Sequence, residues 1–149
     1  MSRSGYGMVL VLLAALGMGC APDTPRGSEA LDCIRAMSQY SREGRVEEYL
    51  NCFAPEMRQR LVRVRQEMKD AAFAEQLRRR AEPVRGIAFS DETPLDANTV
   101  QIKVEWVFED RNEVQMFRLT KADGLWKIAE MTEARYKKPP VPYGTKVFD

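Results

Sequence analysis

Apolar residues recur at steps of three and four along the first half of the chain, a spacing that predicts amphipathic helices. A first helix is expected from about Glu29 to Glu43, with Ser28 as its N-cap and Gly44 as its stop. A second, short helix follows, and its apolar face is made of Val46, Tyr49, Leu50 and Phe53. These two helices are expected to fold back on each other at Gly44.

A third helical segment begins at Pro55, a residue that suits the first turn of a helix. Its apolar stripe consists of Met57, Leu61, Val64, Met68 and Ala72, a spacing typical of core packing. The segment is either one long helix or two short ones broken between Lys69 and Ala72, and it ends before Pro83. A solvated last turn, favoured by the helix dipole, is expected to hold Arg78, Arg79 and Arg80.

Beyond Pro83, apolar residues alternate with polar ones, which is the period of a half-buried strand. Four strands are expected, at Val84–Ser90, Thr99–Phe108, Val114–Thr120 and Leu125–Met131. Helices followed by antiparallel strands indicate an α+β fold. We therefore expect N-terminal helices that pack on a curved, four-stranded antiparallel sheet in a cone-like arrangement.

Two turns suggest a register for the sheet. A two-residue turn at Asp110-Arg111 would set Val104 opposite Phe117. A type I′ turn at Asp123-Gly124 would set Leu119 opposite Ile128 and Phe117 opposite Glu130. Both turns place the same apolar side chains on one face: Val100, Ile102, Val104, Trp106, Phe117, Leu119, Trp126 and Ile128. A candidate pocket is expected along this face, lined by Val104, Trp106, Phe117, Leu119, Trp126, Ile128 and Glu130.

Three of these features together resemble the nuclear transport factor 2-like superfamily, and especially its small bacterial lipoproteins of unknown function. They are the break at Gly44, the helix led by Pro55, and the hairpin Asp123-Gly124-Leu125-Trp126-Lys127-Ile128. The resemblance covers roughly residues 29–134 and implies a cone-shaped α+β fold. It does not select a function, because the superfamily contains isomerases, cyclases and dehydratases as well as non-catalytic binding modules.

The N-terminus reads as an export signal. An unbroken run of apolar or small residues from Met8 to Met18 follows Arg3, and it is too short for a membrane-spanning helix of ~20 residues. Gly17 and Gly19 then lead into Cys20, which resembles the lipobox of bacterial lipoproteins, although a leucine stands four residues before the cysteine instead of three. The alternative is an ordinary cleaved signal with a free cysteine nearby.

This resemblance implies that Cys20 is acylated and anchors the protein in the cell envelope. Ala21, in place of an aspartate, favours the outer membrane, with the protein facing the periplasm. The expected organisation is a lipoprotein signal peptide at 1–20, a tether at 21–28, a cone-shaped domain at 29–135 and a proline-rich extended tail at 136–149.

Two further cysteines, Cys33 and Cys52, are what a single disulfide needs in an oxidising periplasm. They lie eleven residues before Gly44 and eight after it, so at 1.5 Å per residue both stand ~12 to 17 Å from the bend. If the two helices fold back on each other, the cysteines can meet. We expect a disulfide that staples the fold, and the spacing excludes a CxxC redox centre.

Charge and residue types exclude several functions. The chain has 23 basic and 22 acidic residues, which gives no reason to expect a nucleic-acid partner. A basic stretch at 58–80 and an acidic one at 91–113 are expected to be solvated faces. The chain contains no histidine, which removes the commonest general base and the usual zinc ligand. We expect no metal and no cofactor.

What remains for catalysis is a carboxylate that works with a tyrosine. The expected register places Glu130 beside Phe117 on the apolar face, where burial could raise its pKa and let it act as a base. Tyr40 and Tyr49 are candidate proton donors from the helices. End-of-strand carboxylates are usually solvated or paired, so the alternative is that Glu130 stands at the open end of the sheet, in solvent or beside Arg135.

Two functions are therefore open. The first is a non-catalytic, membrane-tethered periplasmic module that binds a small apolar ligand or an envelope protein, with a homodimer as one option; sparse catalytic residue types favour it. The second is a small isomerase- or dehydratase-like enzyme that uses Glu130. The tail is expected to lie outside the sheet, because its prolines oppose a helix or a central strand, and to shelter Tyr143 and Phe148 against the domain or a partner.

Overall fold

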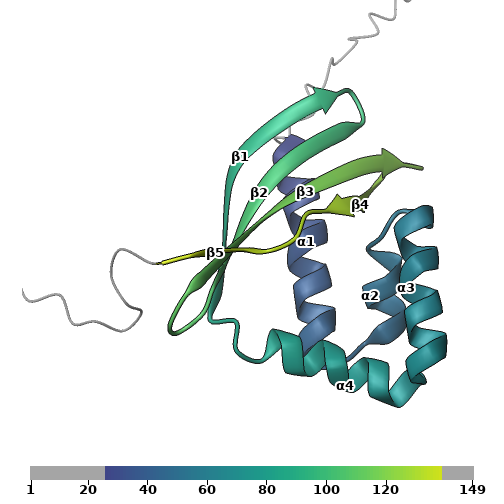
Figure 1. Ribbon diagram of the computed structural model, residues 1–149. Coiled ribbons are helices and arrows are strands. Elements are labelled where there is room, and N and C mark those ends of the chain that lie inside the picture. Colours follow the sequence, from purple (N-terminus) through teal and green to yellow (C-terminus); the bar gives the residue numbers. More distant parts are fainter. Residues whose placement is uncertain (1–25, 139–149) are drawn as a thin grey trace, which may run out of the picture.

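The structure, a computed structural model, describes residues 26–138, which form four helices and a five-stranded antiparallel sheet (Figure 1). The predicted signal peptide, Cys20, Tyr143 and Phe148 lie outside the described residues. The helices are α1 (Arg26–Glu43), α2 (Val46–Asn51), α3 (Pro55–Met68) and α4 (Asp70–Ala81). The strands are β1 (Gly86–Asp96), β2 (Thr99–Val107), β3 (Asn112–Ala122), β4 (Leu125–Met131) and β5 (Arg135–Lys137).

The helices follow the predicted pattern, with differences at the ends of the first two. Helix α1 begins at Arg26, so Ser28 lies inside the helix and the predicted tether overlaps its first turn. Phe53 follows α2 and forms a parallel bridge with Ile128 of β4. The third segment takes the two-helix form, with a break at Lys69, whose φ is +70°.

Gly44 makes the turn between α1 and α2. Its φ of +68° lies in the left-handed region that glycine adopts without strain, and the amide of Arg45 donates to the carbonyl of Tyr40 at 2.9 Å. A Cβ at position 44 would stand 2.6 Å from the Arg78 guanidinium. The turn therefore also allows α4 to approach closely, and glycine satisfies both requirements.

The sheet has the order β1-β2-β3-β4, with β5 paired to β3. The prediction of four strands is thus wrong, and so is the placement of Tyr136 and Lys137 outside the sheet. The reason is the length of β3: β4 pairs with its second half only, which leaves residues 112–114 free for β5. Thr132 spans the gap, because its amide donates to the Met116 carbonyl at 3.0 Å.

The hydrophobic core lies between one face of the sheet and the helices, with α1 running along that face (Figure 1). Every residue of the predicted apolar face belongs to this core, which confirms that face. A smaller cluster of Leu50, Phe73 and Leu77 joins α2 to α4. No helix within residues 26–138 is long and apolar enough to cross a membrane.

The predicted β2–β3 register is wrong by two residues, since Ile102 pairs with Phe117. The loop between these strands has four residues and not two, because the amide of Phe108 donates to the carbonyl of Arg111 at 2.9 Å and Phe108 turns into the core. A shift of two equals the side-chain period of a strand, so the same residues still face the helices.

Candidate functional site

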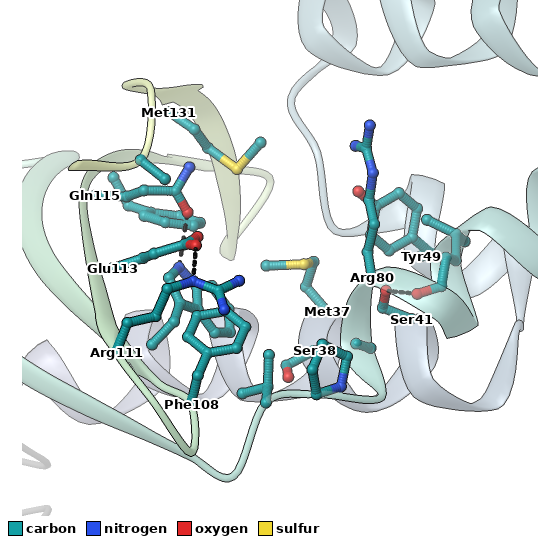
Figure 2. A pocket seen from close by; sticks show the side chains of 17 residues that line it. Met37, Ser38, Ser41, Tyr49, Arg80, Phe108, Arg111, Glu113, Gln115 and Met131 are labelled. Atoms are coloured by element: carbon teal, nitrogen blue, oxygen red, sulfur yellow. Dashed lines mark hydrogen bonds and ion pairs between the residues drawn. The ribbon is translucent and has the colours of Figure 1, made fainter. Parts of the chain in front are cut away.

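A cleft of about 550 Å³ opens where the helices diverge from the end of the sheet that carries the β2–β3 loop (Figure 2). Its helix wall comes from α1, α2 and α4, and its sheet wall from β2, β3, β4 and the loop. The labelled side chains of the two walls face each other across the cleft, with Met37 between them (Figure 2).

The helix wall combines small polar and aromatic groups. Met37, Ser38 and Ser41 lie on one face of α1, as their spacing of one turn dictates. The Ser41 hydroxyl donates to the Leu77 carbonyl at 3.1 Å, which ties α1 to α4. Tyr49 of α2 completes the wall beside Arg80 of α4 (Figure 2).

On the sheet wall, polar side chains bind one another. The Trp106 indole donates to the Gln115 side-chain oxygen at 2.7 Å, and the Gln115 amide nitrogen donates to the Thr132 carbonyl at 3.0 Å. Arg111 pairs with Glu113 at 2.8 Å and lies 4.2 Å above the Phe108 ring. These groups therefore already have partners before any ligand enters.

Among the residues that line the cleft, Tyr49 has the most strongly shifted pKa. Its ring contacts Phe53 and Phe73 edge to face, with centroid distances of 5.0 and 6.4 Å. Burial raises the pKa of Tyr49 to about 12, although the nearby Arg80 charge acts in the opposite direction. The phenol is thus protonated at neutral pH and can only serve there as a neutral hydrogen-bonding group.

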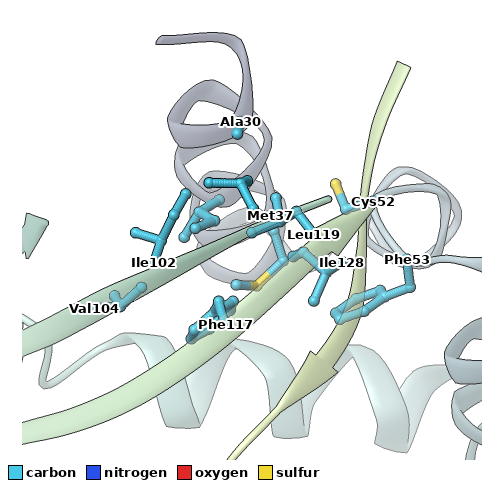
Figure 3. Packing of buried hydrophobic residues seen from close by; sticks show 11 residues of the cluster. Ala30, Met37, Cys52, Phe53, Ile102, Val104, Phe117, Leu119 and Ile128 are labelled. Carbon is cyan, nitrogen blue, oxygen red and sulfur yellow. The ribbon is translucent and has the colours of Figure 1, made fainter. Parts of the chain in front are cut away.

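Three of the seven residues of the predicted pocket lining are filled core. Val104, Leu119 and Ile128 are fully buried among α1 side chains (Figure 3) and contribute nothing to the cleft. Trp106 and Phe117 do line the cleft, and so does Tyr49. Tyr40 and Trp126 line a different hollow. The cleft therefore shares only Trp106 and Phe117 with the predicted lining.

Glu130 does not lie where the sequence placed it. A β-bulge between Arg118 and Leu119 leaves Ala129 without a partner, so Phe117 pairs with Met131 and Arg118 with Glu130. Glu130 therefore points to the solvent face, where it forms an ion pair with Arg118 and is more than half exposed. The predicted position of this carboxylate on the apolar face is wrong.

Several residues of the cleft were not found from the sequence. The sequence pattern indicates only a solvated last turn for Arg80. Gln115 lies on β3 and Arg111 on the β2–β3 loop, and the directions of their side chains depend on the length of that loop. Met131 enters the cleft because the bulge in β4 reverses the last residues of that strand. Only the helical spacing of Met37 and Ser41 could have indicated a shared face.

The second hollow, also about 550 Å³, lies between α1, α2 and the β3–β4 hairpin. Here the Cys33 thiol donates to the Cys52 carbonyl at 3.6 Å, and the Cys52 thiol donates to the Glu48 carbonyl at 3.4 Å. The interaction with the Cys52 side chain lowers the pKa of Cys33, while the interaction with the Cys33 side chain and burial raise the pKa of Cys52. Both residues are free thiols in this structure, so the predicted disulfide is absent although the pair is in contact.

Comparisons add no family to this geometry. No protein-family model and no curated protein sequence matches the chain. Among the residues with described side chains, no group of three or more cysteine, aspartate and glutamate residues could hold a metal ion. Functional inference therefore depends on the cleft itself.

The raised pKa of Tyr49 predicts a specific loss of stability at alkaline pH. The pKa of about 12 in the folded protein exceeds the ordinary tyrosine pKa of about 10, so the folded protein holds this proton more tightly than the unfolded chain does. The resulting stabilisation is complete below pH 10 and disappears as the pH rises towards 12. Urea unfolding of the wild type and Tyr49→Phe across this range should show a smaller loss in the variant. Tyr136→Phe, which alters an exposed tyrosine, is the control, and equal losses in all three proteins would contradict the assignment.

Proposed function

We propose that the protein is a membrane-tethered periplasmic module that binds a small, largely apolar ligand in the cleft between the helices and the sheet. The observation that carries this proposal is the cleft of about 550 Å³, which the core side chains leave unfilled. Its size lies within the range of roughly 300–1,000 Å³ typical of ligand pockets. In the cone-like form that the family resemblance implies, this cleft is the mouth of the cone.

The lining favours binding through apolar contact with a few polar groups for orientation. Met37, Phe108 and Met131 present flexible or aromatic surfaces, and methionine adapts readily to ligands of different shapes. Trp106 and Phe117 extend the apolar surface inwards. A ligand that covers these side chains gains hydrophobic stabilisation of roughly 25 cal/mol for each Å² of apolar surface removed from water.

The same residues give little support to catalysis. Glu113 is the only carboxylate in the described lining, and it is engaged by Arg111. Tyr49 is protonated and lies on the opposite wall, while Glu130 lies on the other face of the sheet. A general base within reach of a donor is what an isomerase or dehydratase needs, so the enzyme alternative is not favoured.

Export and anchoring belong to the same proposal and are supported by the sequence. The apolar run before Cys20 and the resemblance to a lipobox favour acylation of this cysteine and retention at the outer membrane. Cys33 and Cys52 would then meet oxidising conditions, and their contact in the structure favours a disulfide between them.

Binding in the cleft predicts that a neutral apolar dye such as N-phenylnaphthylamine will fluoresce with the purified protein. Met131→Trp, which fills the cleft, should weaken dye binding by about tenfold, equivalent to ~1.4 kcal/mol. Met116→Trp changes a methionine of β3 that does not line the cleft and serves as the matched control. Absence of dye binding to the wild type, or equal binding to both variants and the wild type, would contradict the proposal.

Acylation predicts that Cys20→Ser will move the protein from the membrane fraction to the soluble periplasmic fraction, because the residue that carries the lipid is lost. Fractionation and intact mass measure this directly. A wild-type protein that is soluble and carries no added lipid mass would show that the anchor does not exist.

Oxidation predicts that non-reducing peptide mapping of the periplasmic protein will find Cys33 joined to Cys52. Closing so short a loop should stabilise the fold by ~3 kcal/mol in the chain-entropy model. Cys33→Ser should therefore unfold at lower denaturant than the oxidised wild type, and most of this difference should vanish under a reducing agent. Free thiols at both positions in the native protein would remove this part of the proposal.

A further inference from the structure

We propose that the ligand of the cleft carries an acidic group on its apolar body, and that Arg80 is the residue that binds this anion. The inference deepens the proposed function and depends on it, because it concerns the same cleft. The basis of the inference is the pairing of the charged side chains in the lining, since some are neutralised by a partner and one is not.

Three charged side chains line the cleft: Arg80, Arg111 and Glu113. Arg111 is neutralised by ion pairs with Glu113 at 2.8 Å and with Asp110 at 3.0 Å. Arg80 forms no ion pair with any residue from 29 to 138. The uncompensated charge of the cleft is therefore positive and belongs to the helix wall.

The carboxylates of α4 are paired with arginines other than Arg80. Asp70 pairs with Arg65 at 2.7 Å, and Glu75 lines a separate hollow together with Arg79 and Arg80. Glu75 also pairs with Arg78 at 3.7 Å. Glu113 lies on the opposite wall of the cleft, held by Arg111 (Figure 2). An incoming anion thus meets an available guanidinium on the helix wall.

A second donor stands beside this guanidinium. The Tyr49 hydroxyl lies next to the Arg80 side chain (Figure 2), and among the described residues it has no hydrogen-bond partner. A phenol that keeps its proton and an arginine together suit a carboxylate, which accepts hydrogen bonds through two oxygens. The aromatic and methionine side chains nearby then contact the apolar part of the same molecule.

A comparison with Arg79 distinguishes a role of Arg80 in the cleft from a role as one more solvated arginine in the last turn of α4. Arg79 precedes Arg80 in α4 and contributes the same charge to the C-terminal end of the helix, but it does not line the cleft. If Arg80 acted only through helix stability or general positive charge, loss of either arginine would have the same effect. A role in the cleft predicts different effects of the two substitutions.

The test compares decanoate, decanol and decyltrimethylammonium, which share an apolar chain and differ in head-group charge, as competitors of the neutral dye. The wild type should bind decanoate about tenfold more tightly than decanol, as expected for a charge-assisted hydrogen bond at a partly exposed site, and should bind the cation most weakly. The preference for decanoate should decrease as salt is added. Arg80→Gln should abolish this preference by weakening the binding of decanoate, whereas Arg79→Gln should retain the preference.

The possible outcomes separate the inference from the proposed function. Equal affinity for decanoate and decanol, or equal loss of the preference in Arg79→Gln and Arg80→Gln, would overturn the role of Arg80 while the cleft remained a binding site. Failure of the dye and of every competitor to bind would overturn the proposed function itself, and the role of Arg80 with it. Unfolding midpoints of both variants, expected to equal that of the wild type, exclude a loss of fold.

Discussion

The packing of α1 on the concave face of the sheet is the interaction on which the rest of the structure depends. Ile34 of α1 is fully buried against the sheet, and Ile102 and Leu119 of the sheet are fully buried as well. Burial of each such side chain contributes roughly 1.5–3 kcal/mol. Once α1 is held there, the turn at Gly44 returns α2 to its side, and the hydrogen bond from Ser41 fixes α4 across its end. The segment after α2 then reaches β4, where the amide of Ile128 donates to the carbonyl of Cys52 at 2.9 Å. This segment covers the outer edge of β4.

The cleft is a consequence of where this packing stops. The apolar stripe of α1 changes to Ser38 and Ser41 near its C-terminal end, so the helix has less apolar surface to bury there. On the sheet side, Trp106 and Gln115 bind each other and keep their polar groups satisfied without help from the helices. The two walls therefore remain apart, and the space between them is lined by side chains that are stable with or without a ligand. Among its charged groups, Arg80 is the one that this internal pairing omits.

Two local irregularities of the sheet decide which groups reach the cleft. The four-residue loop after β2 brings Phe108 and Arg111 to its rim, since Phe108 turns inwards and Arg111 stacks on its ring. The bulge in β4 moves Glu130 to the solvent face and Met131 to the cleft. A single extra residue thus exchanges a carboxylate for a thioether, because successive side chains of a strand point to opposite faces. The difference between an acid–base site and an apolar binding surface rests on that exchange.

The sequence by itself determined the helices, the break at Gly44, most of the sheet and the face of the sheet that is buried. These features depend on local periodicity and on turn residues, and the buried face tolerated a register error because that error was two residues, the full period of a strand. The sequence could not determine β5, the bulge in β4 or the cleft. Short strands such as Arg135–Lys137 exist only because β3 offers an unpaired edge, and Arg80 looks like any solvated arginine until α1, α2 and α4 are placed together. Tertiary structure decided the site because a cleft is defined by the distance between walls that are remote in the chain, and residue periodicity carries no information about that distance.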